Sequence, residues 1–167
     1  MAALVEQDDR LARALVKRLI DQDGLDLATA KLSYDAWKYQ PTKSEFHQAA
    51  GSRLRLMAEG DVAISEILSV YHDYAAVTQG RLGLENSQLL SLAEHFAAPE
   101  SINEAADLVR RVLHEDDENP QLPHAMLNIA KVFADIDAPH SRRLLYDIIG
   151  LFPESPEARI AKKTLGK

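Results

Sequence analysis

Apolar residues along this chain recur at the three- and four-residue spacing of an amphipathic helix, and the alternation typical of strands is absent. The first stripe consists of Leu4, Leu11, Leu15 and Leu19 and predicts a helix over residues 3–21. Similar stripes predict helices over about residues 25–37, 43–59, 61–79, 86–97, 102–113, 120–134, 139–151 and 156–165. We therefore expect an all-α chain of about nine helices, whose short loops make neighbours antiparallel.

Glycine, proline and capping residues separate these stripes. Thr42-Lys43-Ser44-Glu45 and Ser101-Ile102-Asn103-Glu104 have the spacing of capping boxes. Asn119-Pro120 and Ser155-Pro156 have a capping residue followed by a proline suited to the first helical turn. Gly60-Asp61 is expected to end one helix and to cap the next.

Part of the chain is duplicated. Residues 89–97 (LLSLAEHFA) match residues 126–134 (MLNIAKVFA), and a shift of 36 residues lays Leu108, Val109, Val112 and Leu113 onto Leu144, Leu145, Ile148 and Ile149. A repeat of this length is typical of stacked helical hairpins, each of which needs its neighbours to bury its apolar face.

The duplicated unit resembles the tetratricopeptide repeat, a pair of antiparallel helices that approach closely at small residues. Gly51, Ala93 and Ala130 match those small positions, and Pro153 follows the third pair as in the family. The resemblance implies a right-handed α-solenoid forming a single domain over residues 1–167. It comprises a helical hairpin at 3–40, repeat units at 42–80, 85–118 and 120–153, and a capping helix at 155–166.

The repeats are degenerate. Ala93 and Ala130 are 37 residues apart, whereas Ala130 and Ala161 are only 31 apart. The residues of the family's carboxylate-clamp subclass are not recognisable as a set. The small positions carry a physical prediction of their own, since a large residue there would push the helices apart at a cost of about 1–3 kcal/mol.

Charge and composition narrow the function. The chain carries 26 acidic and 19 basic residues, a net charge of −7, which disfavours binding to nucleic acid. Because the chain has no cysteine, we expect no disulfide. Because charged residues interrupt its first twenty positions, we expect neither a signal peptide nor membrane insertion there. We expect a cytoplasmic protein, or the cytoplasmic or periplasmic soluble part of a membrane-associated one.

Motifs for catalysis, metal binding and cofactor binding are missing. The six histidines do not have the spacing of metal ligands, and the acidic run at residues 115–118 lacks the pattern of a calcium loop. Neither a nucleophile elbow nor a glycine-rich phosphate loop is present. We therefore expect a protein that is not an enzyme and has no catalytic residues, metal or cofactor; an enzyme site assembled from helix-borne acids and histidines is the less favoured alternative.

Basic pairs occupy equivalent places in successive repeats, at Arg110/Arg111 and Arg142/Arg143. We interpret them mainly as solvated residues that pair with nearby acids. The alternative is a charged stripe that selects an acidic partner.

The resemblance implies that the concave face binds a protein or peptide. Its candidate contacts lie on the first helix of each unit: Arg53, Met57, Glu94, Asn128 and Lys131. The alternative is a regulatory or assembly domain of a membrane-anchored protein that acts by self-association, as a homodimer.

Overall fold

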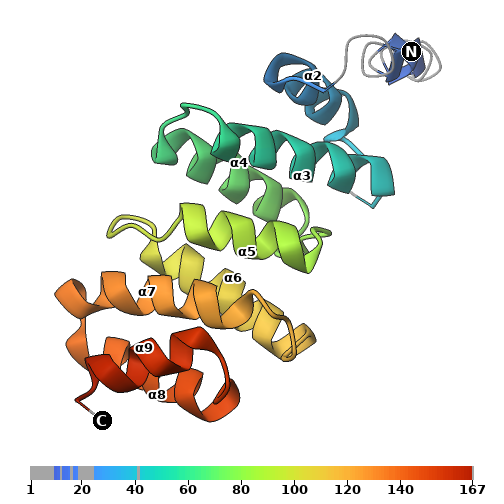
Figure 1. Ribbon diagram of the computed structural model, residues 1–167. Helices are drawn as coiled ribbons and strands as arrows, with labels where there is room; N and C mark the ends of the chain where they lie inside the picture. The colour runs from blue at the N-terminus through green and yellow to red at the C-terminus, as the bar shows by residue number, and fades with distance from the viewer. Residues whose placement is uncertain (1–9, 12, 16, 19–24, 41, 167) are drawn as a thin grey trace. The chain divides into compact units, whose positions relative to one another are not determined.

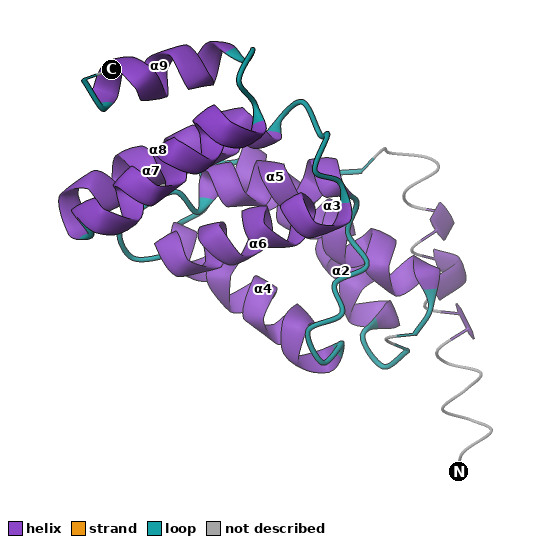
Figure 2. Ribbon diagram, turned by 90° about the horizontal axis from the view of Figure 1, so that it is seen from below, coloured by secondary structure: helices purple, strands orange, loops and turns teal. Residues whose placement is uncertain are grey.

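The computed structural model describes residues 10–11, 13–15, 17–18, 25–40 and 42–166. Over this part the chain is helical and has no strand, which confirms the all-α prediction (Figures 1 and 2). The helices are α2 (Leu27–Trp37), α3 (Ser44–Glu59), α4 (Ile64–Val77), α5 (Asn86–His95), α6 (Ile102–Glu115), α7 (Leu122–Ile136), α8 (Ala138–Leu151) and α9 (Pro156–Thr164). The helix predicted over 3–21 lies largely outside the described residues, and its described positions between 10 and 18 are helical.

Three helices begin at a side chain that accepts a hydrogen bond from the first turn. Ser155 Oγ accepts from the Ala158 N–H at 3.0 Å, which confirms the Ser155-Pro156 start of α9. Asp137 caps α8 and Asp26 caps α2, where the Thr29 N–H lies 2.7 Å from the carboxylate. Hydrogen bonds from Thr29 lower the pKa of Asp26.

The predicted starts at residues 86 and 102 agree with α5 and α6, but the other predicted caps differ from the structure. Lys43 occupies the N-cap of α3 and makes no side-chain cap, and α4 begins after Ala63 instead of Asp61. Ser101 does precede α6, but its hydroxyl donates to the Phe96 carbonyl at 2.9 Å. The helix expected at Asn119-Pro120 begins at Leu122, with Pro123 in its first turn.

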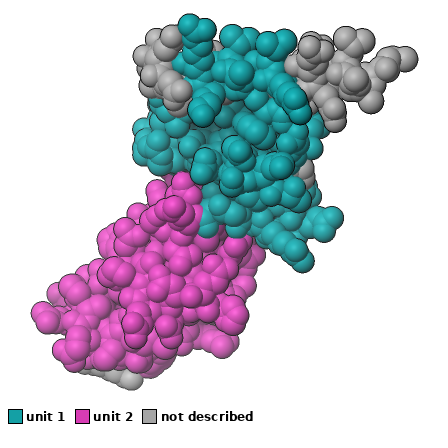
Figure 3. Space-filling view, turned by 90° about the vertical axis from the view of Figure 1, so that its right-hand side faces the viewer, with its two compact units in different colours: residues 1–84 teal, residues 85–167 magenta. Residues whose placement is uncertain are grey.

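The described chain divides into two compact units, residues 1–84 and residues 85–167 (Figure 3). The division falls between the first and second units predicted from the repeat. In unit 1, α3 packs against both α2 and α4. Its core includes Tyr34, Phe46, Leu54 and Tyr74, each at most 5% exposed.

One buried tyrosine joins three segments of unit 1. The Tyr74 hydroxyl on α4 lies 2.6 Å from Nδ1 of His47 on α3. It also accepts a hydrogen bond from the Gly83 N–H at 3.0 Å. A Cβ built on Gly83 would lie 2.5 Å from Cγ of His47, so this loop packs on α3 more closely than any side chain allows.

Helix α7 is the central element of unit 2. It contacts α5, α6, α8 and α9, while α5 also contacts α6, and α8 contacts α9 (Figure 1). Half of α7 is buried, at Leu122, Pro123, Ala125, Met126, Leu127, Ile129, Ala130 and Phe133.

The three small residues predicted to lie at close helix contacts are buried. Ala93 and Ala130 are at most 1% exposed, and Gly51 is buried in α3. At Ala130 the closeness is direct, because Ser141 Oγ of α8 donates to the Ala130 carbonyl of α7 at 2.6 Å. A larger side chain at this buried position would have to displace a neighbouring helix.

Candidate functional site

The five predicted contact residues divide between the two units. Arg53 and Met57 lie on α3 of unit 1, and Glu94, Asn128 and Lys131 lie on α5 and α7 of unit 2. Met57 is 2% exposed, so its place among the surface contacts is wrong. It continues the buried stripe of Ala50 and Leu54 at helical spacing.

Arg53 is half-buried and packs against α2. Its guanidinium carbon lies 5.0 Å from the centroid of the Tyr34 ring, within the range of a cation–π contact. Burial raises the pKa of the Tyr34 hydroxyl, and the charge of Arg53 partly opposes that rise. The side chain of Arg53 therefore stabilises the packing of α2 on α3 in addition to facing solvent.

Asn128 and Lys131 share one face of α7 with a third residue, His124. The three positions follow the four- and three-residue spacing of a helix face, and Lys131 Nζ lies 3.4 Å from Asn128 Oδ1. His124 and Lys131 are exposed and Asn128 is half-buried. We call His124, Asn128 and Lys131 the α7 stripe.

Carboxylates from both flanking helices approach the α7 stripe. Glu94 Oε1 of α5 lies 3.8 Å from His124 Nε2, and Glu157 Oε1 of α9 lies 3.6 Å from His124 Nδ1. The Glu157 side chain is 17% exposed, against 42% for Glu94. When protonated, His124 forms an ion pair with each glutamate, so the three helices share one polar surface bearing both charge signs.

Sequence analysis missed His124 and Glu157. His124 stands four positions before Asn128, so its place on that face is readable from helical periodicity. Glu157 is not readable in this way, because its approach depends on how α9 packs on α7.

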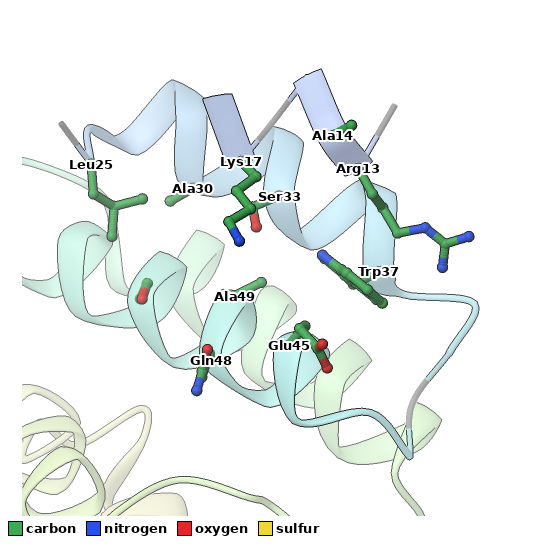
Figure 4. A pocket seen from close by; sticks show the side chains of 11 residues that line it. Arg13, Ala14, Lys17, Leu25, Ala30, Ser33, Trp37, Glu45, Gln48 and Ala49 are labelled. Carbon is green, nitrogen blue, oxygen red and sulfur yellow. The ribbon is translucent and has the colours of Figure 1, made fainter. Parts of the chain in front are cut away.

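A cavity of about 530 Å³ lies in unit 1 between Arg13, Ala14 and Lys17 on one side and α2 and α3 on the other. Figure 4 shows Trp37, Ser33 and Ala49 around it, and the Arg13 guanidinium carbon lies 4.8 Å from the Trp37 ring centroid.

Within the described ranges, no three histidine or acidic side chains lie close enough together to hold a metal ion. The same residues include no helix with the length and apolar character needed to traverse a bilayer. Comparison with protein-family models, curated proteins and solved structures finds no match to the chain.

Proposed function

We propose that this protein is an interaction module of stacked, tetratricopeptide-like helical hairpins, and that the surface of α5, α7 and α9 in unit 2 binds a polar segment of a protein partner. The proposal retains Glu94, Asn128 and Lys131 from the sequence and adds His124 and Glu157.

The contacts within unit 2 support the stacked arrangement. In a stack of helical hairpins, the first helix of each hairpin contacts the first helix of the next. Helix α7 contacts α5 before it and α9 after it, in addition to its hairpin partner α8. Ser141 and Ala130 hold that hairpin together at a small residue, as such a stack requires.

The observation that carries the proposal is the position of His124 between Glu94 and Glu157. Glu94 of α5 and Glu157 of α9 each lie within 4 Å of His124 of α7, and all three side chains remain partly open to solvent. Next to them, Lys131 and the Asn128 amide offer hydrogen-bond donors and an acceptor. Such a surface suits an extended polar segment, since complementary charge sets specificity and the rate of association.

A crosslinking pull-down with two triple variants tests this proposal. In the first variant Glu94, Asn128 and Lys131 are replaced by Ala. In the matched control the same residue types are replaced away from this surface, at Glu118, Asn103 and Lys162, all of which are exposed. We expect the first variant to lose partners that the parent and the control retain. Identical partner sets for all three proteins would refute the proposal.

Self-association is a second candidate, favoured by apolar side chains exposed on the last two helices. Tyr146, Leu151 and Ile160 are 49%, 53% and 47% exposed. Light scattering after size exclusion tests it: a dimer that dissociates when Ile160 is replaced by Glu would support self-association, and a monomer at all concentrations would exclude it.

A further inference from the structure

Unit 2 contains a groove between α6 and α8, separate from the α7 stripe. Both helices pack against α7, and a cavity of about 260 Å³ lies between them. Met126 and Ile129 of α7, at most 2% exposed, line it from below. We call this cavity the α6–α8 groove.

The groove has an apolar part beside the polar lining residues Arg110, His140, Arg143 and Asp147. Val109 and Leu113 of α6 face Leu144 of α8 across it. Leu113 and Leu144 are only half-buried, so each wall has apolar surface available to a further side chain. The volume is below the range of about 300–1,000 Å³ typical of small-molecule pockets, and it suits one bulky side chain of a partner.

An arginine lines the groove on each side, Arg110 from α6 and Arg143 from α8. Arg110 pairs with Asp107 on its own helix at 2.6 Å, but both side chains are about two-thirds exposed, at 68% and 67%. Pairs this exposed contribute little and exchange readily for another carboxylate. Arg143 is exposed, and no carboxylate among the described residues lies within 4.0 Å of it.

The two arginines contrast with the acidic character of the whole chain, whose net charge is −7. A guanidinium presents a planar fork of donors that matches a carboxylate in two parallel hydrogen bonds. Asp147 lines the groove one helical turn after Arg143, so it would repel closely spaced negative charges there, whether a run of phosphates or consecutive carboxylates. Isolated carboxylates beside an apolar side chain therefore fit better than a nucleic acid.

We propose that the α6–α8 groove binds a short acidic segment of another protein. One leucine or phenylalanine of that segment enters between Leu113 and Leu144, and an adjacent aspartate or glutamate pairs with Arg143 and displaces Asp107 from Arg110. The groove is formed by α6 and α8, whereas the α7 stripe lies on α7. Only Met126 and Ile129 of the groove belong to α7.

Defined peptides test the proposal on the full chain. The probes are fluorescently labelled peptides in which leucine or phenylalanine is combined with aspartate and glutamate, together with a charge-reversed set carrying lysine at each acid. Binding is measured by fluorescence anisotropy. We expect the acidic set to bind and the charge-reversed set not to bind; equal binding of the two sets would overturn the proposal.

Adjacent arginines supply a matched pair of variants. Arg143→Glu and Arg142→Glu change the charge equally on neighbouring residues of α8, but Arg142 does not line the groove. We expect Arg143→Glu to weaken binding of the acidic peptide about tenfold or more, since it removes a charge-assisted hydrogen bond. Arg142→Glu should change it less than about twofold, as expected for a screened surface charge. An equal loss in both variants would contradict the assignment.

Two further measurements distinguish binding in the groove from misfolding of the variant and from binding at the α7 stripe. If circular dichroism shows that Arg143→Glu is misfolded, Arg143→Gln and Arg142→Gln are compared instead. Arg143→Gln should then weaken binding of the acidic peptide more than Arg142→Gln does. The Glu94, Asn128 and Lys131 triple variant should bind the acidic peptide with unchanged affinity. Loss of binding in that triple variant would place the peptide on the α7 stripe and refute the groove.

Discussion

Substitution of Gly83 by Ala should destabilise unit 1, although Gly→Ala changes commonly stabilise proteins by restricting the unfolded chain. The added Cβ would lie 2.5 Å from Cγ and 2.6 Å from Nδ1 of His47. Ordinary carbon contacts are about 3.5–4.0 Å, so the imidazole has to retreat by about 1 Å. The Cβ of His47 also lies only 3.0 Å from the added Cβ, so rotation of the imidazole ring alone does not remove the clash.

Retreat of the ring breaks the 2.6 Å hydrogen bond between His47 and the buried Tyr74 hydroxyl. Overpacking costs about 1–3 kcal/mol, and the lost hydrogen bond about 0.5–1.5 kcal/mol. Restriction of the unfolded chain offsets about 0.4–1 kcal/mol. The free energy of unfolding should therefore fall by about 0.5–4 kcal/mol.

Urea unfolding followed by tryptophan fluorescence measures this change, because Trp37 is the chain's single tryptophan and lies in unit 1. In a His47→Ala background the same Gly83→Ala change should cost clearly less than in the parent, since the ring contacts at 2.5 and 2.6 Å are gone and only the 3.0 Å contact with the Cβ of residue 47 remains. Gly150→Ala in unit 2, followed by circular dichroism, is the control for alanine at a position with room: no atom beyond its own helix backbone and chain neighbours lies within 4 Å of the added Cβ, so alanine should stabilise α8. An equal cost of Gly83→Ala with and without His47 would refute the steric reasoning.

Two other predictions follow from the packing and charges of the units. Ala130→Leu should lower the free energy of unfolding by about 1–3 kcal/mol, because Ala130 is 1% exposed on a helix that contacts every other described helix of unit 2. Circular dichroism in urea measures this change, and a stability equal to that of the parent would contradict close packing there. Burial raises the pKa of Asp35, but the hydrogen bond from Lys31 and the charges of Lys31, Lys38 and Arg53 together lower it below its ordinary value. The ion pairs of Asp35 therefore stabilise unit 1 fully at a pH above the ordinary pKa, and this stabilisation is lost as the pH falls through the lowered pKa. The urea midpoints of the parent and of Asp35→Asn should converge in acid. A difference between the two midpoints that stays the same at every pH would argue against this role.

Helix positions were readable from the sequence because periodicity and helix breakers act locally. The predicted end of α3 at Glu59 and the predicted end of α8 at Leu151 agree with the structure. Helices α4 and α5 end at Val77 and His95, two residues before the predicted ends at 79 and 97. Such small differences are usual at fraying helix ends.

Helix caps were harder to predict, because capping depends on backbone geometry as well as residue type. Ser101 has the right side chain and position, but its backbone (φ −132°, ψ 12°) is not extended, and its hydroxyl bonds back to Phe96 instead. At Asp137 the cap was missed, although aspartate followed two positions later by Pro139 is a typical helix start.

The candidate site was only partly predictable. Met57 could have been assigned to the core, because Phe46, Ala50, Leu54 and Met57 follow one helical stripe. The contact between Glu157 and His124 depends on the register with which separate helices pack, and so does the α6–α8 groove. Periodicity assigns a residue to a face of its own helix but does not specify which residues of another helix lie opposite.

The contacts of α7 with every other described helix of unit 2 have a consequence for local opening. If any one of the other helices detaches, α7 remains packed against the rest. If α7 itself detaches, all of its neighbours lose a contact. Amide hydrogens in the middle of α7 should therefore exchange with solvent only through global unfolding of the unit, whereas those of α9, which has fewer neighbours, exchange through partial opening as well.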